Sequence, residues 1–195
     1  ETARTVTLTA ETETIHSSAK LELEPRLGRV SFAAYGGLVT NFGAVTTPII
    51  GGDLDFRVRN PILGDRLMIR VGGGRYAFRD NYRLDGEKWA IASAVYPLTL
   101  GAVYRVDRGP TGAWLGGGAV LGINDLEAST GGQVILDGTL ITFGPTIMGG
   151  VGQRVLGGEA LITLRSIWLR GVGEDLGFNG NIGGLAGGVG YRVLF

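Results

Sequence analysis

From residue 29 onward, apolar and polar residues alternate with a period of two in eight segments separated by turn-like stretches. The segments cover residues 30–42, 50–58, 67–73, 94–104, 113–123, 141–151, 160–168 and 185–195. One face of every segment carries no charged residue. Successive side chains of a strand point to opposite faces, so this pattern predicts eight β-strands with a continuous uncharged face. Most segments have roughly the 9–11 residues that a tilted strand needs to cross a bilayer.

The opposite faces carry the charged residues of these segments and of their ends. They are Arg29, Asp53, Asp55, Arg57, Arg59, Arg66, Arg70, Arg105, Asp107, Arg154, Glu159, Arg165 and Arg192. A membrane barrel would turn this face into its lumen and the uncharged face toward lipid. A soluble sandwich or a lipocalin-like barrel shows the same alternation with its apolar face inward. Periodicity alone therefore leaves both architectures open.

The aromatic residues of the uncharged faces fall into two groups, one near each end of the strands. With the C-terminus on the periplasmic side, the periplasmic rim receives Phe32, Phe56, Tyr104, Tyr191 and Phe195, and the outer rim receives Phe42, Tyr96, Phe143 and Trp168. Aromatic side chains prefer the boundary between lipid headgroups and hydrocarbon. Two aromatic girdles around a band of aliphatic residues and glycine therefore favour the membrane barrel.

The connections between the segments also alternate in length. Those at residues 60–64, 108–112 and 155–158 are short and turn-like. Those around residues 43–49, 74–89, 124–139 and 170–180 are longer and are expected to be loops. Short turns at one end and long loops at the other are typical of outer-membrane barrels, whose periplasmic turns are the short ones.

The chain ends in Tyr191-Arg192-Val193-Leu194-Phe195, an alternating strand closed by an aromatic residue. With the aromatic rims and the asymmetric connections, residues 29–195 resemble the small eight-stranded bacterial outer-membrane β-barrels of the OmpA/OmpX class. The resemblance implies an all-β, closed, antiparallel, up-and-down transmembrane barrel that crosses the bacterial outer membrane several times and is surrounded by its lipid. It also implies that the C-terminal strand is recognised by the barrel-assembly machinery. The function expected of this class is structural, or surface contact and adhesion, sometimes with slight ion passage.

Residues 1–28 fit the barrel pattern poorly. Residues 5–14 and 21–24 alternate, but their apolar face is thin, with little beyond Val6, Leu8, Ala10, Leu21 and Leu23. The segment could be a polar extension, a separate hairpin, or two additional strands that make a barrel of ten. We expect eight strands, because polar strands exposed to lipid are costly.

Composition narrows the function. Lys+Arg and Asp+Glu balance at 18 each, so no excess of positive charge exists to attract nucleic acid. Cysteine is absent, which excludes disulfides, thiol catalysis and cysteine-ligated metals. No run of apolar residues is long enough for a transmembrane helix. The 36 glycines suggest strands that curve tightly or that pack small residues inward.

The inward charges predict an ionic network across the lumen. Its candidate members are Asp53, Asp55, Arg57, Arg59, Arg70, Arg105, Glu159, Arg165 and Arg192. The interpretation that we favour is a structural plug, because an eight-stranded barrel is barely wide enough for its own side chains. The alternative is the gate of a narrow ion-conducting pore. The inward glycines Gly116, Gly118, Gly150, Gly152, Gly188 and Gly190 could make room for the arginines or relieve backbone curvature.

Catalysis is not expected. Asp53 and Asp55 could act as a general acid and base, but no substrate cleft accompanies them. Outer-membrane lipid A deacylases use a Ser/His pair and omptin proteases an Asp/His arrangement, whereas the single histidine here, His16, lies in the divergent N-terminal segment. A lipid-modifying enzyme is the less favoured alternative. We expect no cofactor and no metal; the acidic long loops match no calcium motif and are candidate contacts for a surface ligand.

Overall fold

The computed structural model describes residues 4–12, 15–23, 29–41, 46–60, 62–84, 86–173 and 178–195. Their secondary structure consists of strands. These are β1 (Arg4–Thr12), β2 (Ile15–Leu23), β3 (Val30–Thr40), β4 (Thr46–Asn60), β5 (Gly64–Leu84), β6 (Glu87–Arg108), β7 (Thr111–Thr130), β8 (Gln133–Val155), β9 (Gly158–Ile167), β10 (Arg170–Gly173), β11 (Phe178–Asn181) and β12 (Gly184–Leu194). Among the described residues, no helix is long and apolar enough to cross a bilayer.

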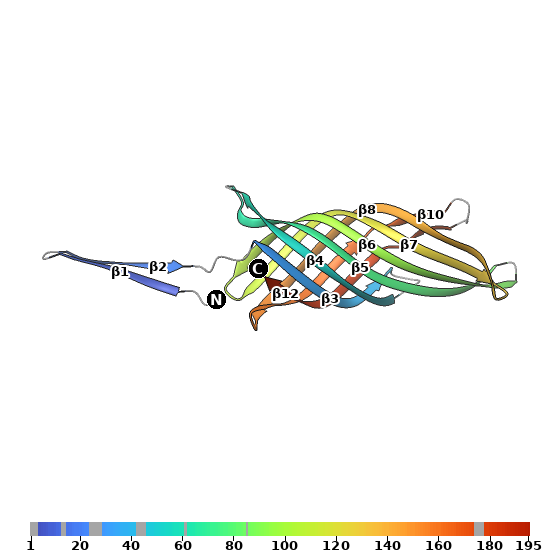
Figure 1. The fold of residues 1–195 in the computed structure, drawn as a ribbon, viewed down its shortest axis with the longest axis horizontal. Helices are drawn as coiled ribbons and strands as arrows, with labels where there is room; N and C mark the ends of the chain where they lie inside the picture. Colours follow the sequence, from blue (N-terminus) through green and yellow to red (C-terminus); the bar gives the residue numbers. More distant parts are fainter. Residues whose placement is uncertain are drawn as a thin grey trace.

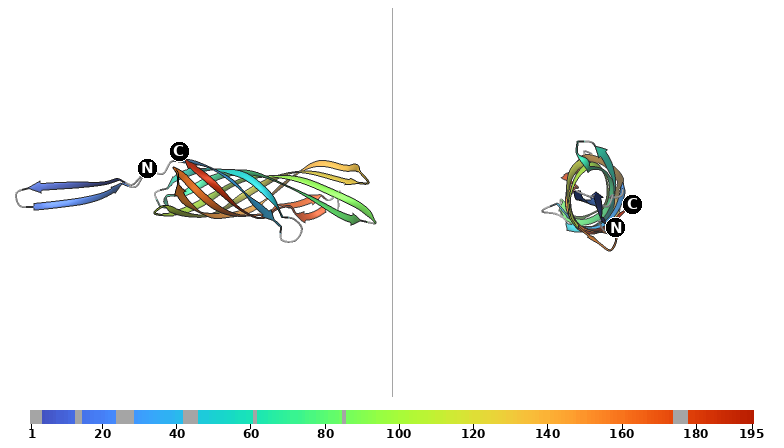
Figure 2. Two further views of the ribbon diagram at one scale, coloured as in Figure 1. Left: turned by 90° about the horizontal axis from the view of Figure 1, so that it is seen from below. Right: turned by 90° about the vertical axis from the view of Figure 1, so that its left-hand side faces the viewer.

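Eight of the strands form a closed barrel in the order β12-β3-β4-β5-β6-β7-β8-β9 (Figures 1 and 2). Every neighbouring pair is antiparallel, and the ring closes where β12 pairs with β3 on one side and β9 on the other. This confirms the predicted up-and-down barrel of eight strands. The ten-stranded alternative is not formed, because β1 and β2 pair with each other in a separate two-stranded sheet.

The direction of the side chains follows the predicted alternation. On β6, for example, Leu98 and Leu100 face outward and are 47% and 59% exposed. Val103, which has the opposite parity, faces inward and is fully buried. The same holds on β12, where Val189 is exposed and Arg192 is buried. The barrel therefore turns its large apolar side chains outward and its charges inward, the reverse of a water-soluble barrel.

The prediction of long loops is wrong for two of the four connections. Residues 74–89 and 124–139 lie largely within β5, β6, β7 and β8, which continue as a paired four-stranded sheet beyond the rest of the barrel (Figure 1). The β7–β8 connection is a tight turn at Gly131 and Gly132, both with positive φ. The prediction failed because outward charges such as Arg79 and Glu127 interrupt the uncharged face, whereas the pairing of the strands continues past them.

The other two long connections are also shorter than expected. Residues 170–180 contain the small hairpin of β10 and β11, and β4 already begins at Thr46. At the opposite end of the barrel, the predicted short turns are present, and the β8–β9 turn places Leu156 and Gly157 at positive φ. The C-terminus lies at this end (Figures 1 and 2).

Candidate functional site

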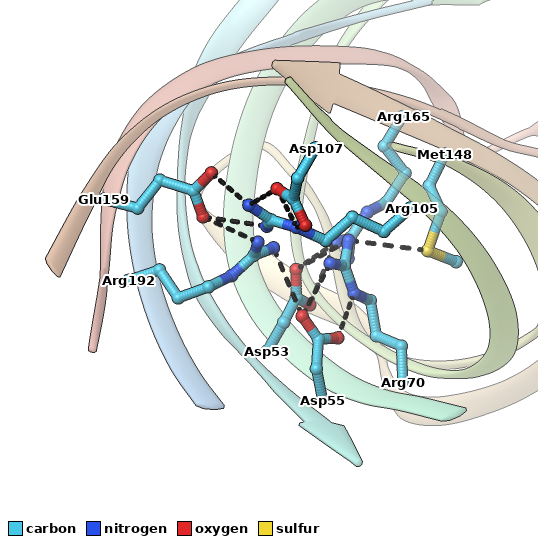
Figure 3. Close-up of polar contacts among 9 residues, drawn as sticks. All are labelled: Asp53, Asp55, Arg70, Arg105, Asp107, Met148, Glu159, Arg165 and Arg192. Atoms are coloured by element: carbon cyan, nitrogen blue, oxygen red, sulfur yellow. Dashed lines mark hydrogen bonds and ion pairs between the residues drawn. The ribbon is translucent and has the colours of Figure 1, made fainter. Parts of the chain in front are cut away.

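The lumen contains a cluster of charged side chains contributed by five strands (Figure 3). We call it the lumen network: Asp53 and Asp55 on β4, Arg70 on β5, Arg105 and Asp107 on β6, Glu159 and Arg165 on β9, and Arg192 on β12. Strand register brings some of the partners together directly. Asp55 lies opposite Arg70 in the β4–β5 pair, and Glu159 lies opposite Arg192 in the β9–β12 pair.

One half of the lumen network is centred on the two aspartates of β4. Arg70 donates through Nε and Nη2 to the two carboxylate oxygens of Asp55, at 2.6 and 2.9 Å. Its Nη1 lies 3.6 Å from Asp53. Arg165 donates through Nη2 to both oxygens of Asp53, at 2.9 and 2.8 Å, and through Nη1 to the hydroxyl of Tyr35 at 3.1 Å. Each aspartate is therefore held by arginines from other strands.

The other half is centred on Glu159. Arg105 on the far side of the lumen donates to both oxygens of Glu159, at 2.7 and 2.9 Å, and also to Asp107 at 2.7 Å. Arg192 donates to Glu159 at 2.9 Å, and its Nη2 forms an ion pair with Asp55 at 3.2 Å. Figure 3 shows the Arg192 guanidinium between the two carboxylates. Arg192 thus connects the two halves of the network.

The lumen network is balanced and almost entirely buried. Four guanidinium groups face four carboxylates, and apart from Asp107 their side chains are at most 7% exposed. Removing such groups from water costs several kcal/mol each, so the arrangement is tolerable only because every carboxylate accepts charged hydrogen bonds. Arginine suits this task because its planar fork binds two carboxylates at once, as Arg105 does.

Two candidate members lie outside the lumen network. Arg57 is half-buried and Arg59 is exposed, and neither belongs to an ion pair of the network among the described residues. Both lie toward the end of β4, where the pairing with β5 shifts register between Val58 and Asn60. Inward parity alone therefore does not place a side chain in the lumen network. The residue must also lie far enough from the end of its strand.

Apolar contacts around the network were not predicted. The Arg70 guanidinium lies over the ring of Trp114, 3.9 Å from its centroid, and Met148 Sδ lies 4.0 Å from Arg70 Nη1. Trp114 and Met148 pack with Met68 and Val103 in one buried cluster. All four residues have the inward parity of their segments, so the alternation of the sequence already places them on the face that carries the charges.

A second, apolar layer fills the lumen on the side of the projecting sheet. It consists of Val39, Ile49, Tyr76, Val95, Val120, Ile167, Leu169, Ile182 and Ala186, all buried. On β4, β5 and β9 these residues lie farther from the C-terminal end of the barrel than the charged residues do. Tyr76 donates its hydroxyl to the Ile182 carbonyl at 2.6 Å, which satisfies its polar atom within this layer.

The inward glycines serve both of the purposes considered. A Cβ on Gly152 would meet the carboxylate of Glu159, so this glycine makes room for a side chain, and a Cβ on Gly150 would meet both the Trp114 ring at 2.6 Å and the Ile162 carbonyl at 2.5 Å. By contrast, a Cβ on Gly116, Gly118, Gly188 or Gly190 would meet the backbone of the neighbouring strand. These four allow close approach of curved strands.

The candidate girdle aromatics lie on the outer surface. Phe32, Phe56, Tyr104, Trp168, Tyr191, Phe143 and Phe195 are exposed and Tyr96 is half-buried, while Phe42 lies outside the described residues. At the C-terminal end of the barrel, Tyr191 donates its hydroxyl to the carbonyls of the β8–β9 turn at 2.9 and 3.0 Å. Tyr104 at the same end accepts a bond from Arg66 at 3.2 Å.

The candidate catalytic residues and possible metal ligands are placed as follows in the described part of the chain. No group of three His, Cys, Asp or Glu residues is placed to hold a metal ion there. His16 lies on β2, opposite Glu11 in the separate hairpin. Asp53 and Asp55 both accept hydrogen bonds from arginines of the lumen network.

No protein-family model and no curated protein sequence matches the chain. Solved structures do. Neisserial surface protein A is 20% identical over 85% of this chain and 95% of its own, with a TM-score of 0.51. The N-terminal barrel of Pseudomonas aeruginosa OprF is 14% identical over 85% and 96%, with a TM-score of 0.53.

The attachment invasion locus protein Ail of Yersinia pestis, solved with the heparin analogue sucrose octasulfate, is 13% identical over 85% and 99%, with a TM-score of 0.53. At these identities the likeness establishes the fold. The chain therefore has the fold of the small eight-stranded outer-membrane β-barrels, as the resemblance of its sequence predicted.

Proposed function

We propose that this chain is an integral bacterial outer-membrane β-barrel that is closed to ions, is not an enzyme and acts in surface contact through its projecting sheet. The observation that carries the proposal is the change along the outer face of the long strands. Within the barrel the outward residues of β6 are Leu98, Leu100, Ala102 and Tyr104, whereas beyond it the outward residues of its partners β5 and β7 include Arg79 and Glu127. Lipid explains the first stretch and water the second.

The apolar outer face supports a lipid environment. Side chains such as Ile147 and Val189 are more than half exposed, which would be an aggregation hazard in water. In hydrocarbon the same side chains are at no disadvantage, and ring closure leaves no unpaired edge within the barrel. We infer that residues 29–195 form the membrane domain and that residues 1–28 lie outside it.

Two features support a closed lumen. The lumen network fills the half nearer the C-terminus with ion pairs, and the apolar layer around Tyr76, Val95 and Val120 fills the other half. An ion would have to displace paired guanidinium groups and then cross a dry layer, where charge is strongly disfavoured. A structural plug therefore accounts for the arrangement better than the gate of a narrow pore does.

The projecting sheet supports a role in surface contact. Its outer face carries a trough of about 450 Å³ lined by Ala77, Phe78, Arg79, Ala92, Ser93, Ala94, Asp125, Leu126, Glu127 and Asp137. The small alanines form the floor, with arginine on the β5 side and carboxylates on β7 and β8. A trough divided between positive and negative charge suits an extended polar partner. Contact with the barrel-assembly machinery belongs to the C-terminal strand at the opposite end.

Site-directed labelling tests the topology. Because the chain has no cysteine, a single introduced thiol reports one position. Arg83→Cys near the tip of the projecting sheet and Arg108→Cys at the opposite end of β6 are matched exposed sites. A membrane-impermeant maleimide should label Arg83→Cys on intact cells and Arg108→Cys only after the outer membrane is permeabilised. Recovery of unlabelled protein in the soluble fraction would refute the membrane assignment.

Conductance measurements separate the closed barrel from the pore. Purified wild-type protein in planar bilayers should give no stable channels. The pore alternative instead requires channels that Arg70→Ala or Arg165→Ala abolishes or enlarges, because both side chains cross the lumen. Heat-modifiable gel migration of each variant, the shift of band on boiling that folded barrels show, confirms that the protein tested is folded.

A further inference from the structure

A small cavity lies at the end of the lumen network nearest the C-terminus. Its volume is about 10 Å³, which is room for roughly one water-sized species. Its walls include the side chains of four arginines, Arg29, Arg57, Arg105 and Arg192, but only one carboxylate, that of Asp55. The surroundings of the cavity are therefore strongly positive, although the lumen network as a whole is balanced.

Two of these arginines have hydrogen-bonding capacity that the protein does not use. Arg192 is 1% exposed, yet its Nε has no hydrogen-bond acceptor among the described residues, and its Nη2 is held only by the ion pair with Asp55 at 3.2 Å. The Nε of Arg57 is also buried without an acceptor in that part of the chain. A buried charged donor without an acceptor costs more than an ordinary unmade hydrogen bond, so the absence of a partner at two adjacent arginines is unusual.

The charge balance agrees with these unused donors. The cavity wall holds Arg29 and Arg57 in addition to two arginines of the lumen network, and the further carboxylate that attracts Arg57 is Asp65. Positive charge is therefore in excess around the cavity. A water molecule could accept one of the free N–H groups but would leave this charge uncompensated.

We propose that the cavity is a binding site for one small monovalent anion of the size of chloride, held by Arg57 and Arg192. The anion would accept from the unused Nε groups and offset the excess of positive charge around the cavity. Room for about one water-sized species suits a monatomic anion better than phosphate or sulfate. The site opens at the end that carries Arg29 and Arg57, because the apolar layer closes the other side.

Chloride titration of the folded barrel tests the site. In detergent, chloride replaces gluconate at constant ionic strength and pH, and the urea midpoint of unfolding is read from the heat-modifiable band. A ligand that binds only the folded state stabilises it in proportion to the logarithm of its concentration above its dissociation constant. The midpoint of the wild type should therefore rise with chloride.

Two variants separate binding from general salt effects. Arg57→Met removes one of the two anion donors, whereas Arg59→Met removes an exposed arginine two residues along the same strand face that does not line the cavity. The chloride concentration that gives half of the rise should increase at least about tenfold in Arg57→Met and stay unchanged in Arg59→Met. An equal rise in all three proteins would be a general effect of the salt and would overturn the proposal, as would no rise in the wild type.

Bromide gives a direct second measurement that does not depend on stability. Crystals grown in bromide should show an anomalous peak between Arg57 and Arg192 in the wild type and no such peak in Arg57→Met. Ordered water without an anomalous signal in the wild-type cavity would refute the anion site even if the titration were positive.

Discussion

The bidentate pair between Arg70 and Asp55 should be among the most strongly coupled interactions in the lumen. The perturbation is a double-mutant cycle with Arg70→Met, Asp55→Asn and the double variant. Methionine keeps much of the contact with the Trp114 ring, and asparagine keeps the shape of aspartate. The cycle therefore removes the charges with little change in volume and isolates their mutual interaction from the contacts of each residue with Asp53 or Arg192.

The expected magnitude follows from burial and geometry. The two N–O distances are 2.6 and 2.9 Å, and both side chains are at most 1% exposed, so water screens the pair little. Two unit charges about 4 Å apart at an effective dielectric constant near 20 attract each other by about 4 kcal/mol. Each single variant leaves a buried charge with fewer partners, which typically costs about 3–5 kcal/mol. The double variant should cost less than the sum by about 2 kcal/mol or more.

The measurement is equilibrium unfolding in urea, from lipid vesicles or detergent, followed by the heat-modifiable band and by tryptophan fluorescence. Arg59→Met serves as the control, since its exposed side chain lies outside the lumen network and its loss should change stability by less than about 0.5 kcal/mol. A coupling below about 0.5 kcal/mol, the range of exposed surface pairs, would refute the reasoning that the network is desolvated.

Three further substitutions test other layers of the structure. Leu100→Arg places a charge on the outer face midway between the girdle residues of β6 and should cost about 2–4 kcal/mol in lipid vesicles, whereas a protein whose outer face meets water would tolerate it. Gly152→Val forces a side chain against the carboxylate of Glu159 and should cost about 1–3 kcal/mol in the same urea assay; an unchanged midpoint would contradict the close packing. Tyr76→Phe removes the hydroxyl bonded to the Ile182 carbonyl and should cost about 1 kcal/mol by urea titration, unless that carbonyl finds another donor.

The part of the fold that the sequence could predict is the part in which every second residue is uncharged. The inward parity of Asp53, Arg70 and Arg192 was enough to orient their strands. The uncharged face ends where β5 to β8 continue beyond the rest of the barrel. Outward residues such as Asp125 and Glu127 therefore look like loop residues, although the strands that carry them remain paired.

Seven of the nine candidate residues lie in the lumen network, but their pairing was not predictable. Which arginine meets which carboxylate depends on the stagger of neighbouring strands and on contacts across the barrel, and parity fixes neither. Arg105 and Glu159 lie on β6 and β9, which are not neighbours, and they meet only because the barrel is narrow. Arg57 and Arg59 have inward parity, but both lie too close to the end of β4 to join the network.

The two layers of the lumen depend on each other. An ionic layer alone would admit water from both ends and would lose much of its attraction through screening. The apolar layer around Val95, Val120 and Tyr76 keeps water out on the side of the projecting sheet, so the charged layer is strong there and meets solvent only past Arg57 and Arg29. A lumen with one dry side and one side accessible to solvent is a blind pocket. The proposed closed barrel and anion site together require such a pocket, which would exchange a small ion with one compartment without conducting that ion to the other.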